Sequence, residues 1–355
     1  MPADSDIERI LEEKRAGIDR TIAKYLPREY GAKEFEFACG KPRYAHLTRE
    51  ATEAISKPMW DLLDRGGKRW RPVLFMLIIE ALGGDPKKVE DLIVIPELVH
   101  NATLIHDDIE DNSETRRGKP CLHKIYGVDI AINVGDGLYY VPMLSVLRNT
   151  RLDDNTRIRI LETYMQEMIN ITFGQGADIY WHKGMRKEVG EEEYLQMCAF
   201  KTGTLARMSA KIAAIASGGN AKTIEACGRF AEAIGVAFQI QDDVLTVSNA
   251  GRFKKEFGED ITEGKRSLMV IHCFNNAPKK DAGRLRGILD AHTRDPKRIA
   301  EAISLLEKTG SVDYAKKRSR EIVGGAWGEL EPLLKGSPAK EKLRLFAEFL
   351  SNREM

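Results

Sequence analysis

The chain has 355 residues, of which 43% are hydrophobic, and its 55 Lys and Arg nearly balance its 54 Asp and Glu. This composition excludes a disordered chain, and a formal net charge of +1 gives no long-range attraction to nucleic acid or anionic lipid. The five cysteines form no Cys-x-x-Cys pair, which argues against a disulfide framework or a structural zinc site. The longest apolar run, residues 73–79, is far shorter than the ~20 residues that span a bilayer. We therefore predict a cytoplasmic protein with no transmembrane segment and no nucleic-acid partner.

Helical periodicity dominates the chain. The first 50 residues, which contain Pro27, Gly31, Gly40 and Pro42, are the least regular part. Beyond them, apolar residues recur with the spacing of one helix face in residues 95–105, 158–173, 194–215, 234–245, 268–274 and 343–350. Short Gly and Pro clusters separate these stretches, and no convincing alternation of period two occurs. The pattern predicts an all-α protein with a single large helical domain over residues 1–355.

An acidic run, residues 107–111, ends the apolar stretch at 95–105. Asp107 and Asp111 are four residues apart, so their carboxylates fall on one helix face. A solvated helix end is the ordinary interpretation of such a run. However, the preceding helix is apolar nearly all round, as in a buried helix, and acids are unfavourable at a helix C-terminus. A hard divalent cation such as Mg²⁺ would compensate these carboxylates.

Basic residues flank this acidic run. Gly66-Gly67-Lys68-Arg69-Trp70-Arg71-Pro72 precedes it, and Arg116-Arg117-Gly118-Lys119-Pro120 follows it. Guanidinium groups bind phosphate oxygens bidentately, and glycine lets the backbone approach a ligand closely. Each basic cluster alone could be a solvated surface. Together with the acidic run, they favour a diphosphate held by Mg²⁺ on one side and by cations on the other.

A second acidic pair, Asp242-Asp243, lies on another apolar helix, and Gln239 can share a face with Asp242. Charged residues broken by glycine follow at 254–266, which predicts a loop or lid. Gly203, inside a helical pattern, is a candidate kink that would aim Lys201 into a cavity.

These motifs together resemble those of the trans-isoprenyl diphosphate synthases, also called polyprenyl synthetases. The resemblance covers most of the chain, from about Gly66 to Arg266, and includes GGKRWRP, ELVHNATLIHDDIED, RRGKP, GQGADIYW, KTGTL, FQIQDDV and EDITEGKRSL. It implies the all-α isoprenoid synthase fold with a central cavity, a homodimer and three Mg²⁺ ions. GQGADIYW is most similar to the geranylgeranyl-forming members.

The resemblance also implies a role for each matching position. Asp107 and Asp111 would hold two of the Mg²⁺ ions and Asp242 the third, with Asp108 and Asp243 as outer or occasional ligands. The diphosphate of isopentenyl diphosphate would be bound by Lys68, Arg71, His100 and Arg117. The allylic diphosphate would be bound by Arg116, Lys201 and Lys265, and the allylic cation would be steadied by Thr202 and Gln239.

One position departs from the family pattern, and the role of some others is not fixed by it. The second motif often ends in a third Asp, where this chain has Thr246, so we expect a modest loss of metal support. A lysine of the following loop falls on Lys255 in one alignment and on Glu256 in another. From the residues alone, a buried core histidine is the favoured explanation of His100, and His106 has no assigned role.

The product length depends on the residues one turn before the first aspartates, which are Ala102 and Thr103. Members that stop at farnesyl diphosphate carry bulky aromatic residues there. Each five-carbon unit buried in an apolar pocket gains roughly 3–4 kcal/mol, so the tail extends until something blocks it. With Val99 and Pro96 lying deeper, we predict a product of about twenty carbons or longer.

The sequence therefore predicts a Mg²⁺-dependent prenyltransferase that condenses isopentenyl diphosphate head to tail (1′–4) with an allylic diphosphate. A terpene cyclase shares the first acidic motif but would not need Lys68, Arg71 and Arg117 for a second diphosphate. Further alternatives are a non-catalytic subunit of a heteromeric synthase and a helical interaction protein whose charged clusters are surface charge.

Overall fold

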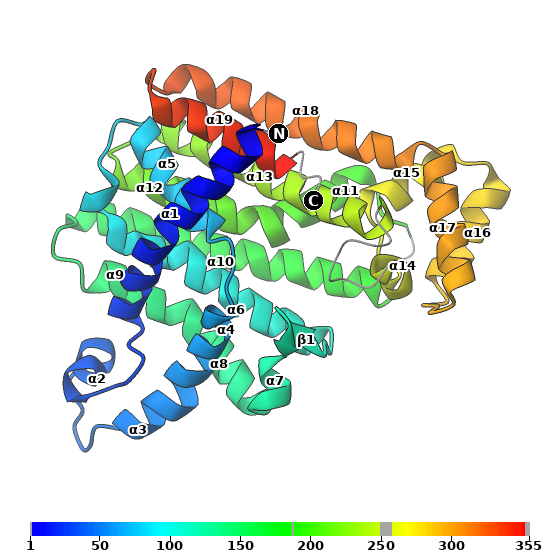
Figure 1. Cartoon of the computed structure of the whole chain (residues 1–355). Coiled ribbons are helices and arrows are strands. Elements are labelled where there is room, and N and C mark those ends of the chain that lie inside the picture. Colours follow the sequence, from blue (N-terminus) through cyan, green and yellow to red (C-terminus); the bar gives the residue numbers. More distant parts are fainter. Residues whose placement is uncertain (1, 187, 249–257, 352–355) are drawn as a thin grey trace. The chain divides into compact units, whose positions relative to one another are not determined.

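The computed structural model describes residues 2–186, 188–248 and 258–351. The chain divides into two compact units, Met1–Thr163 with Ile212–Gly219, and Tyr164–Lys211 with Asn220–Met355. Both are built almost wholly of helices, so the all-α prediction is confirmed (Figure 1). The single domain expected over residues 1–355 stays a prediction.

Unit 1 contains the N-terminal helices. They are α1 (Pro2–Tyr25), α2 (Ala32–Cys39), α3 (Thr48–Glu50), α4 (Lys57–Asp64), α5 (Trp70–Ala81), α6 (Val94–Glu110), α7 (Leu122–Ile125), α8 (Val128–Tyr140), α9 (Leu144–Leu147) and the start of α10 (Asp154–His182). A π-helical turn, Ala51–Ser56, precedes α4, and 3₁₀ turns lie at Pro86–Lys88, Glu90–Ile93 and Val141–Met143.

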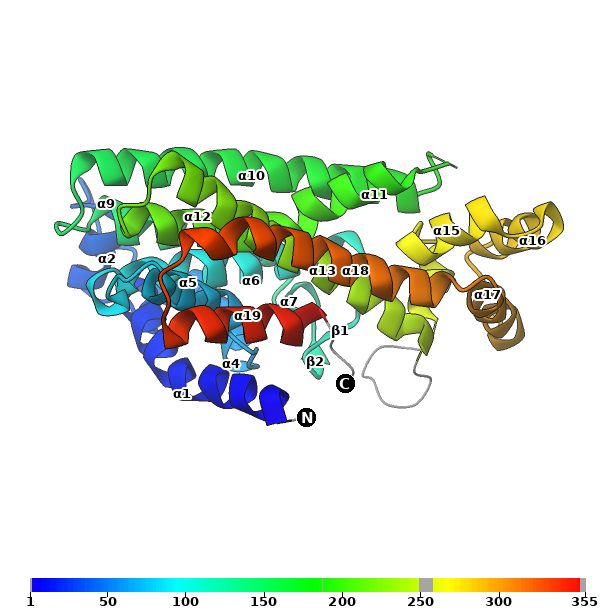
Figure 2. The same cartoon turned by 90° about the horizontal axis from the view of Figure 1, so that it is seen from above.

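Unit 2 contains the rest of α10 and most of the C-terminal half. Its elements are α11 (Glu191–Cys198), a π-helical turn (Ala199–Gly203), the first part of α12 (Thr204–Ala216), α13 (Ala221–Ser248), α14 (Glu259–Glu263), α15 (Leu268–Asn276), α16 (Lys279–Leu289), α17 (Pro296–Lys308), α18 (Ser311–Leu330), a 3₁₀ turn (Glu331–Leu333) and α19 (Pro338–Ser351). The long helices α13 and α18 pack along each other, and α15, α16 and α17 cluster at one end of the unit (Figures 1 and 2).

Helix α1 is more regular than the sequence suggested. Ile7, Leu11, Ile18 and Ile22 are spaced by four and seven residues, which places them on one helix face, and each is buried in unit 1. This amphipathic face ends before Pro27 and Gly31, so the irregularity of residues 1–50 is confined to the segment after Tyr25.

Among the described residues, the strands form one short antiparallel hairpin of two residues each, β1 (Thr115–Arg116) and β2 (Lys119–Pro120). Its turn residues, Arg117 and Gly118, have φ values of 53° and 77°. Two consecutive positive φ values form the tight turn whose twist matches paired antiparallel strands. Arg117 and Gly118, in one of the short Gly and Pro clusters that separate the helical stretches, therefore form a hairpin turn.

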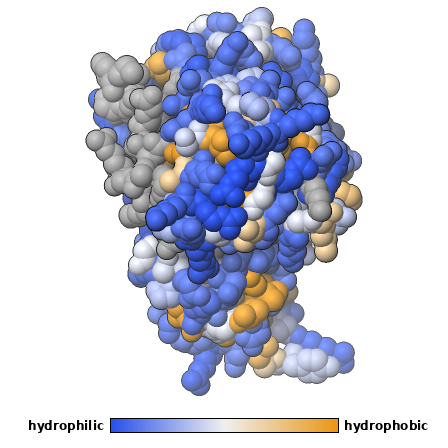
Figure 3. All heavy atoms as spheres, turned by 90° about the vertical axis from the view of Figure 1, so that its right-hand side faces the viewer, coloured by the Kyte–Doolittle hydropathy of each residue, from blue (hydrophilic) through white to orange (hydrophobic). Residues whose placement is uncertain are grey.

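One stretch, Val128–Leu147, is long and apolar enough to cross a membrane by length and composition alone. Half of it is buried inside the fold, and a core helix of a soluble protein passes the same test. Gly135, Asp136 and Gly137 interrupt its apolar run, so this stretch does not stand out in the sequence. The molecular face drawn in Figure 3 is mainly hydrophilic, with separate apolar patches.

Candidate active site

The first acidic motif closes the C-terminal end of α6 in unit 1. The backbone N–H of Asp111 donates to the carbonyl of Asp107 at 2.9 Å, so helical geometry continues through the motif. Asp107 and Asp111 therefore lie one turn apart on one face, as predicted from their spacing. Asp108, on a different face, is buried, and its Oδ1 accepts a hydrogen bond of 2.8 Å from Nε of Arg116. Asp108 thus already has a cationic partner within the protein.

The two arginines of the β1–β2 hairpin form hydrogen bonds with different partners. Arg116 pairs with Asp108, whereas Nη1 of Arg117 lies 3.3 Å from both the Asn101 side-chain oxygen and the Leu62 carbonyl. Burial and the positive charges of neighbouring arginines lower the pKa of Arg117 to about 10. An anion bound here would relieve that repulsion between cations.

His100 of α6 stands among these guanidinium groups. Burial, together with neighbouring arginines, lowers the pKa of His100 well below its ordinary value, so the imidazole is neutral near pH 7. The arginines that contribute are Arg71, Arg117, Arg116 and Arg69. A cationic environment of this kind favours an anion-binding role for His100 over that of an apolar core histidine.

Three members of this basic region have partners of their own. Nη1 of Arg69 lies 2.7 Å from Oε1 of Glu97, and both residues are buried. The Arg71 guanidinium lies over the Trp70 ring, 4.3 Å from its centroid. Lys68, with Nζ 3.9 Å from Glu8, is the most exposed cation of its motif. The ion pair between Arg69 and Glu97 fixes the start of α5 against α6, which sequence reasoning did not foresee.

In unit 2, the π-helical turn Ala199–Gly203 carries Lys201 and Thr202, at the position where the sequence predicted a kink. Glycines of two other helices allow this turn to approach closely. A Cβ on Gly174 of α10 would lie 2.3 Å from the Lys201 nitrogen, and one on Gly235 of α13 would lie 2.6 Å from the Gly203 Cα. The Lys201 ammonium group then lies 2.5 Å from Oδ2 of Asp178 on α10.

A hydrogen-bond chain connects this turn to the second acidic motif. The Thr202 hydroxyl donates to Oε1 of Gln239 at 2.8 Å, and Nε2 of Gln239 donates to Oδ1 of Asp243 at 2.9 Å. Tyr194 of α11 donates to the other oxygen of Asp243 at 2.7 Å. Gln239 therefore hydrogen-bonds to Asp243, which lies four residues further along the same helix. Burial, with Asp260 nearby, raises the pKa of Asp243 above its ordinary value.

The segment after the second motif is partly helical. Residues Glu259–Glu263 form α14, bounded by Gly258 and Gly264 in the left-handed conformation, so the loop predicted over 254–266 is wrong for these residues. Lys265 lies 3.0 Å from Asp260 and 2.7 Å from Glu263. Although burial opposes it, these carboxylates raise the pKa of Lys265 well above its ordinary value. Lys255 lies outside the described residues.

Comparison with known proteins identifies the family. The polyprenyl synthetase family model matches residues 52–306. The chain belongs to the polyprenyl synthetase family. The short chain isoprenyl diphosphate synthase of Methanothermobacter thermautotrophicus is 38% identical over 303 residues, which cover 85% of this chain and 91% of that protein. The geranylgeranyl pyrophosphate synthase of Geoglobus acetivorans is 34% identical, with 87% and 93% covered.

Solved structures agree with the family assignment. The crystal structure of geranylgeranyl pyrophosphate synthetase from Pyrococcus horikoshii superposes with a TM-score of 0.85 at 33% identity, covering 99% of each chain. The isoprenoid synthase fold predicted for this polyprenyl synthetase is therefore confirmed, as is the family resemblance.

Several residues of this polyprenyl synthetase site were missed from the sequence. Asp178 and Asp260 stand inside the quoted GQGADIYW and EDITEGKRSL motifs, and both pair with predicted lysines. Tyr194 carried no signal, because a tyrosine on an apolar helix face resembles any other core residue. Charge pairing with the predicted cations could have identified the two aspartates.

The carboxylates of the two acidic motifs are candidate ligands for a divalent cation. Within residues 2–186, 188–248 and 258–351, no group of three or more His, Cys, Asp or Glu side chains is placed to hold a metal ion by itself. Mg²⁺ commonly takes only one or two carboxylates and completes its octahedron with water and substrate phosphates. The pair Asp107 and Asp111 and the single Asp242 fit that mode of binding.

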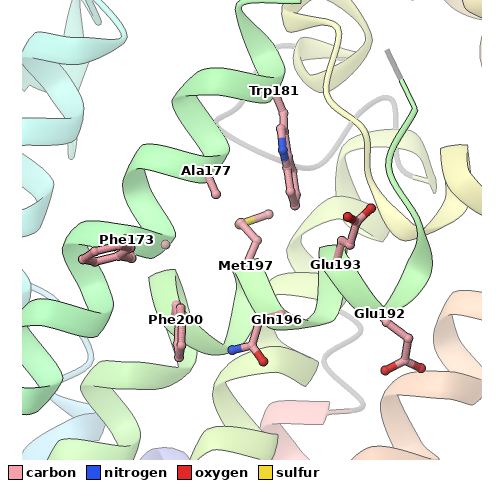
Figure 4. Close-up of a pocket in the computed structure, with 9 residues that line it drawn as sticks. Phe173, Ala177, Trp181, Glu192, Glu193, Gln196, Met197 and Phe200 are labelled. Atoms are coloured by element: carbon pink, nitrogen blue, oxygen red, sulfur yellow. The ribbon is translucent and has the colours of Figure 1, made fainter. Parts of the chain in front are cut away.

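A pocket of about 310 Å³ lies between α10 and α11 of unit 2 (Figure 4). Its walls are mostly apolar and include Phe173, Trp181, Met197 and Phe200, while carboxylates from Glu192 and Glu193 stand at one side. Because carboxylates repel phosphate groups, this pocket does not suit a diphosphate.

Proposed function

We propose that this enzyme condenses isopentenyl diphosphate head to tail with an allylic diphosphate, in a reaction that requires Mg²⁺, to give a prenyl diphosphate of about twenty carbons or longer. The observation that carries this proposal is the set of arginines around the neutral His100, next to the carboxylate pair that ends α6. The names of the relatives, which include geranylgeranyl and short chain isoprenyl diphosphate synthases, support the same activity.

Three Mg²⁺ ions are assigned to the carboxylates, two to Asp107 and Asp111 and one to Asp242, with Asp108 and Asp243 outside the direct ligand set. When bound, these ions stabilise the negative charge that develops on the departing diphosphate. Asp108 accepts a hydrogen bond from Arg116, and Asp243 is hydrogen-bonded to Tyr194 and Gln239.

The cations of the chain bind and orient the two substrates. Isopentenyl diphosphate is assigned to Lys68, Arg71, His100 and Arg117. The allylic diphosphate is assigned to Arg116, Lys201 and Lys265. Orientation of two reactants converts an encounter into an effectively unimolecular step, and fixed positive charge stabilises the leaving group.

Thr202 and Gln239 steady the allylic cation through oxygen atoms. The amide nitrogen of Gln239 faces the Asp243 carboxyl group, and its amide oxygen accepts the hydrogen bond from Thr202. An oxygen fixed in this orientation stabilises positive charge without reorganisation.

The product length follows from α6. Ala102 is fully buried, and the Thr103 hydroxyl is turned to its own helix, donating to the His100 carbonyl at 2.8 Å. Both side chains are small, so the wall one turn before Asp107 leaves room for a long tail, with Val99 and Pro96 further along.

We further propose a cytoplasmic homodimer. On α8 the side chains of Val128, Ile132 and Tyr140 are exposed, and on α10 those of Ile169 and Phe173 are exposed. Exposed apolar side chains that gather on a helix surface are typical of an oligomer interface.

The decisive experiment incubates the enzyme with isopentenyl diphosphate and each allylic primer, with and without Mg²⁺, and measures the product length. We expect Mg²⁺-dependent products of about twenty carbons or longer. Turnover of an allylic diphosphate alone, without isopentenyl diphosphate, would instead indicate a cyclase, and no turnover would favour a non-catalytic subunit.

A further inference from the structure

Thr246 of α13 makes two connections to the segment that carries Lys265. Its hydroxyl lies 2.8 Å from Oδ2 of Asp260, and its carbonyl accepts a hydrogen bond of 3.3 Å from the backbone N–H of Gly258. The hydroxyl also lies 2.8 Å from the Asp243 carbonyl within its own helix. Because a carboxylate is the stronger acceptor, the bond to Asp260 is the one that links the two elements. One residue therefore holds both the start of α14 and its buried carboxylate.

The connection continues from Asp260 to Lys265. The Asp260 side chain is almost fully buried, and its Oδ1 lies 3.0 Å from Nζ of Lys265. The backbone N–H of Lys265 also donates to the Asp260 carbonyl at 3.0 Å. An ammonium group has three donors, and Asp260 and Glu263 account for two of them. The third can serve a phosphate oxygen once the first two fix the position of the group.

This arrangement requires a hydrogen-bond donor at position 246. Thr246 meets that requirement, whereas an aspartate there would place a second carboxylate within contact of Asp260 and could not donate to it when ionised. Like charges at that distance in a buried site are strongly unfavourable.

We propose that Thr246 is a positioning residue, which replaces a third carboxylate of the second acidic motif by a link through Asp260 that aims Lys265 at the allylic diphosphate. The inference rests on the proposed role of Lys265 in binding that diphosphate. It makes Thr246 part of substrate recognition rather than a weakened metal ligand.

The first test compares Thr246→Val with Thr246→Ser in the full-length enzyme. Valine has the shape of threonine without its hydroxyl, and serine keeps the hydroxyl. We expect Thr246→Val to raise the KM for the allylic diphosphate about fivefold or more, because a hydrogen bond to a charged group is lost. The KM for isopentenyl diphosphate should change less than about twofold, and Thr246→Ser should restore the allylic KM.

Thr262→Val is the matched control. Thr262 lies on α14, and its hydroxyl lies 3.1 Å from the Thr293 carbonyl rather than from Asp260. This variant removes a hydroxyl from the same segment, so an allylic KM that rises equally in Thr262→Val would overturn the inference. Melting temperatures of all variants show whether each is folded, and a lower melting temperature with both KM values unchanged would reduce Thr246 to a structural role.

Lys265→Gln separates this inference from the proposed function. If Lys265→Gln leaves the allylic KM unchanged, the assigned role of Lys265 is wrong. If Lys265→Gln raises it and Thr246→Val does not, the link through Thr246 is wrong. We expect the double variant to be no worse than Lys265→Gln alone, since both changes remove the same contact with substrate.

A final variant, Thr246→Asp, distinguishes a positioning role of Thr246 from that of a weakened metal ligand. We expect weaker binding of inorganic pyrophosphate with Mg²⁺ in calorimetry, because the new carboxylate meets Asp260. Tighter binding than in the unmodified enzyme would show that the threonine is a weakened metal ligand and would overturn the inference.

Discussion

The hydroxyl of Tyr194 on α11 donates a hydrogen bond of 2.7 Å to the buried carboxylate of Asp243 on α13. The other oxygen of Asp243 accepts from Gln239, whose own oxygen accepts from Thr202. A residue with no apparent role in the chemistry thereby stabilises the carboxylate that sets the orientation of the Gln239 amide.

Tyr194→Phe tests this relationship. The ring stays in the core, but one oxygen of a buried carboxylate loses its donor, so we expect the free energy of unfolding to fall by about 1–3 kcal/mol. Denaturant unfolding measures it. Tyr180→Phe, at a half-exposed position, is the control and should change stability by less than about 0.5 kcal/mol. Equal stability of both variants would contradict the assigned hydrogen bond.

Ala102→Phe should shorten the product. The new ring would occupy the wall of α6 one turn before Asp107, where Ala102 is fully buried, and would block the growing tail. Overpacking costs about 1–3 kcal/mol, so the melting temperature must show that the variant is folded. Ala102→Ser, which adds little volume, should keep the original product. A folded Ala102→Phe enzyme with an unchanged product length would refute the assignment of this wall.

Asp107→Ala should abolish turnover, by about 10²-fold or more, because the leaving diphosphate loses electrostatic stabilisation. It should also weaken the binding of pyrophosphate with Mg²⁺, measured by calorimetry. Asp313→Asn, at an exposed position on α18, is the control for loss of one negative charge. Near-normal activity of Asp107→Ala would count against the metal assignment.

Gly174→Ala and Gly176→Ala should have opposite effects on stability. A Cβ at position 174 would lie 2.3 Å from the Lys201 nitrogen, so we expect a loss of about 1–3 kcal/mol. A Cβ at position 176 meets nothing within 4 Å, and alanine in a helix gains roughly 0.5–1 kcal/mol over glycine. Thermal unfolding measures both, and a tolerated Gly174→Ala would mean that the π-helical turn does not approach α10 so closely.

Thiol reactivity should report on burial. Cys39 is exposed, whereas Cys121, Cys198, Cys227 and Cys273 are buried, and burial raises the pKa of Cys121 and of Cys227 to about 12. Because the thiolate is the reactive form, we expect a thiol reagent to modify Cys39 quickly in the folded enzyme. The other four should react only after denaturation, and Cys39→Ser should remove the fast phase. A second fast thiol would contradict the described packing.

The helix content, the acidic motifs and the family could be read from the sequence, since hydrophobic periodicity and the spacing of Asp107 and Asp111 are properties of neighbouring residues. The same local reasoning failed where glycine decides conformation. Arg117 and Gly118 form a hairpin turn rather than a simple break, and Gly258 and Gly264 bound a short helix where a loop was expected.

Tertiary structure alone decided which partner each buried polar side chain takes. Tyr194 and Asp243 are 49 residues apart, and Thr246 and Asp260 are 14 apart, so no local spacing relates them. A buried charge must find its partner wherever packing places one, and the cost of leaving it without one exceeds any local preference. The sequence therefore determined which chemical groups this enzyme carries, and packing determined which partner each buried polar group takes.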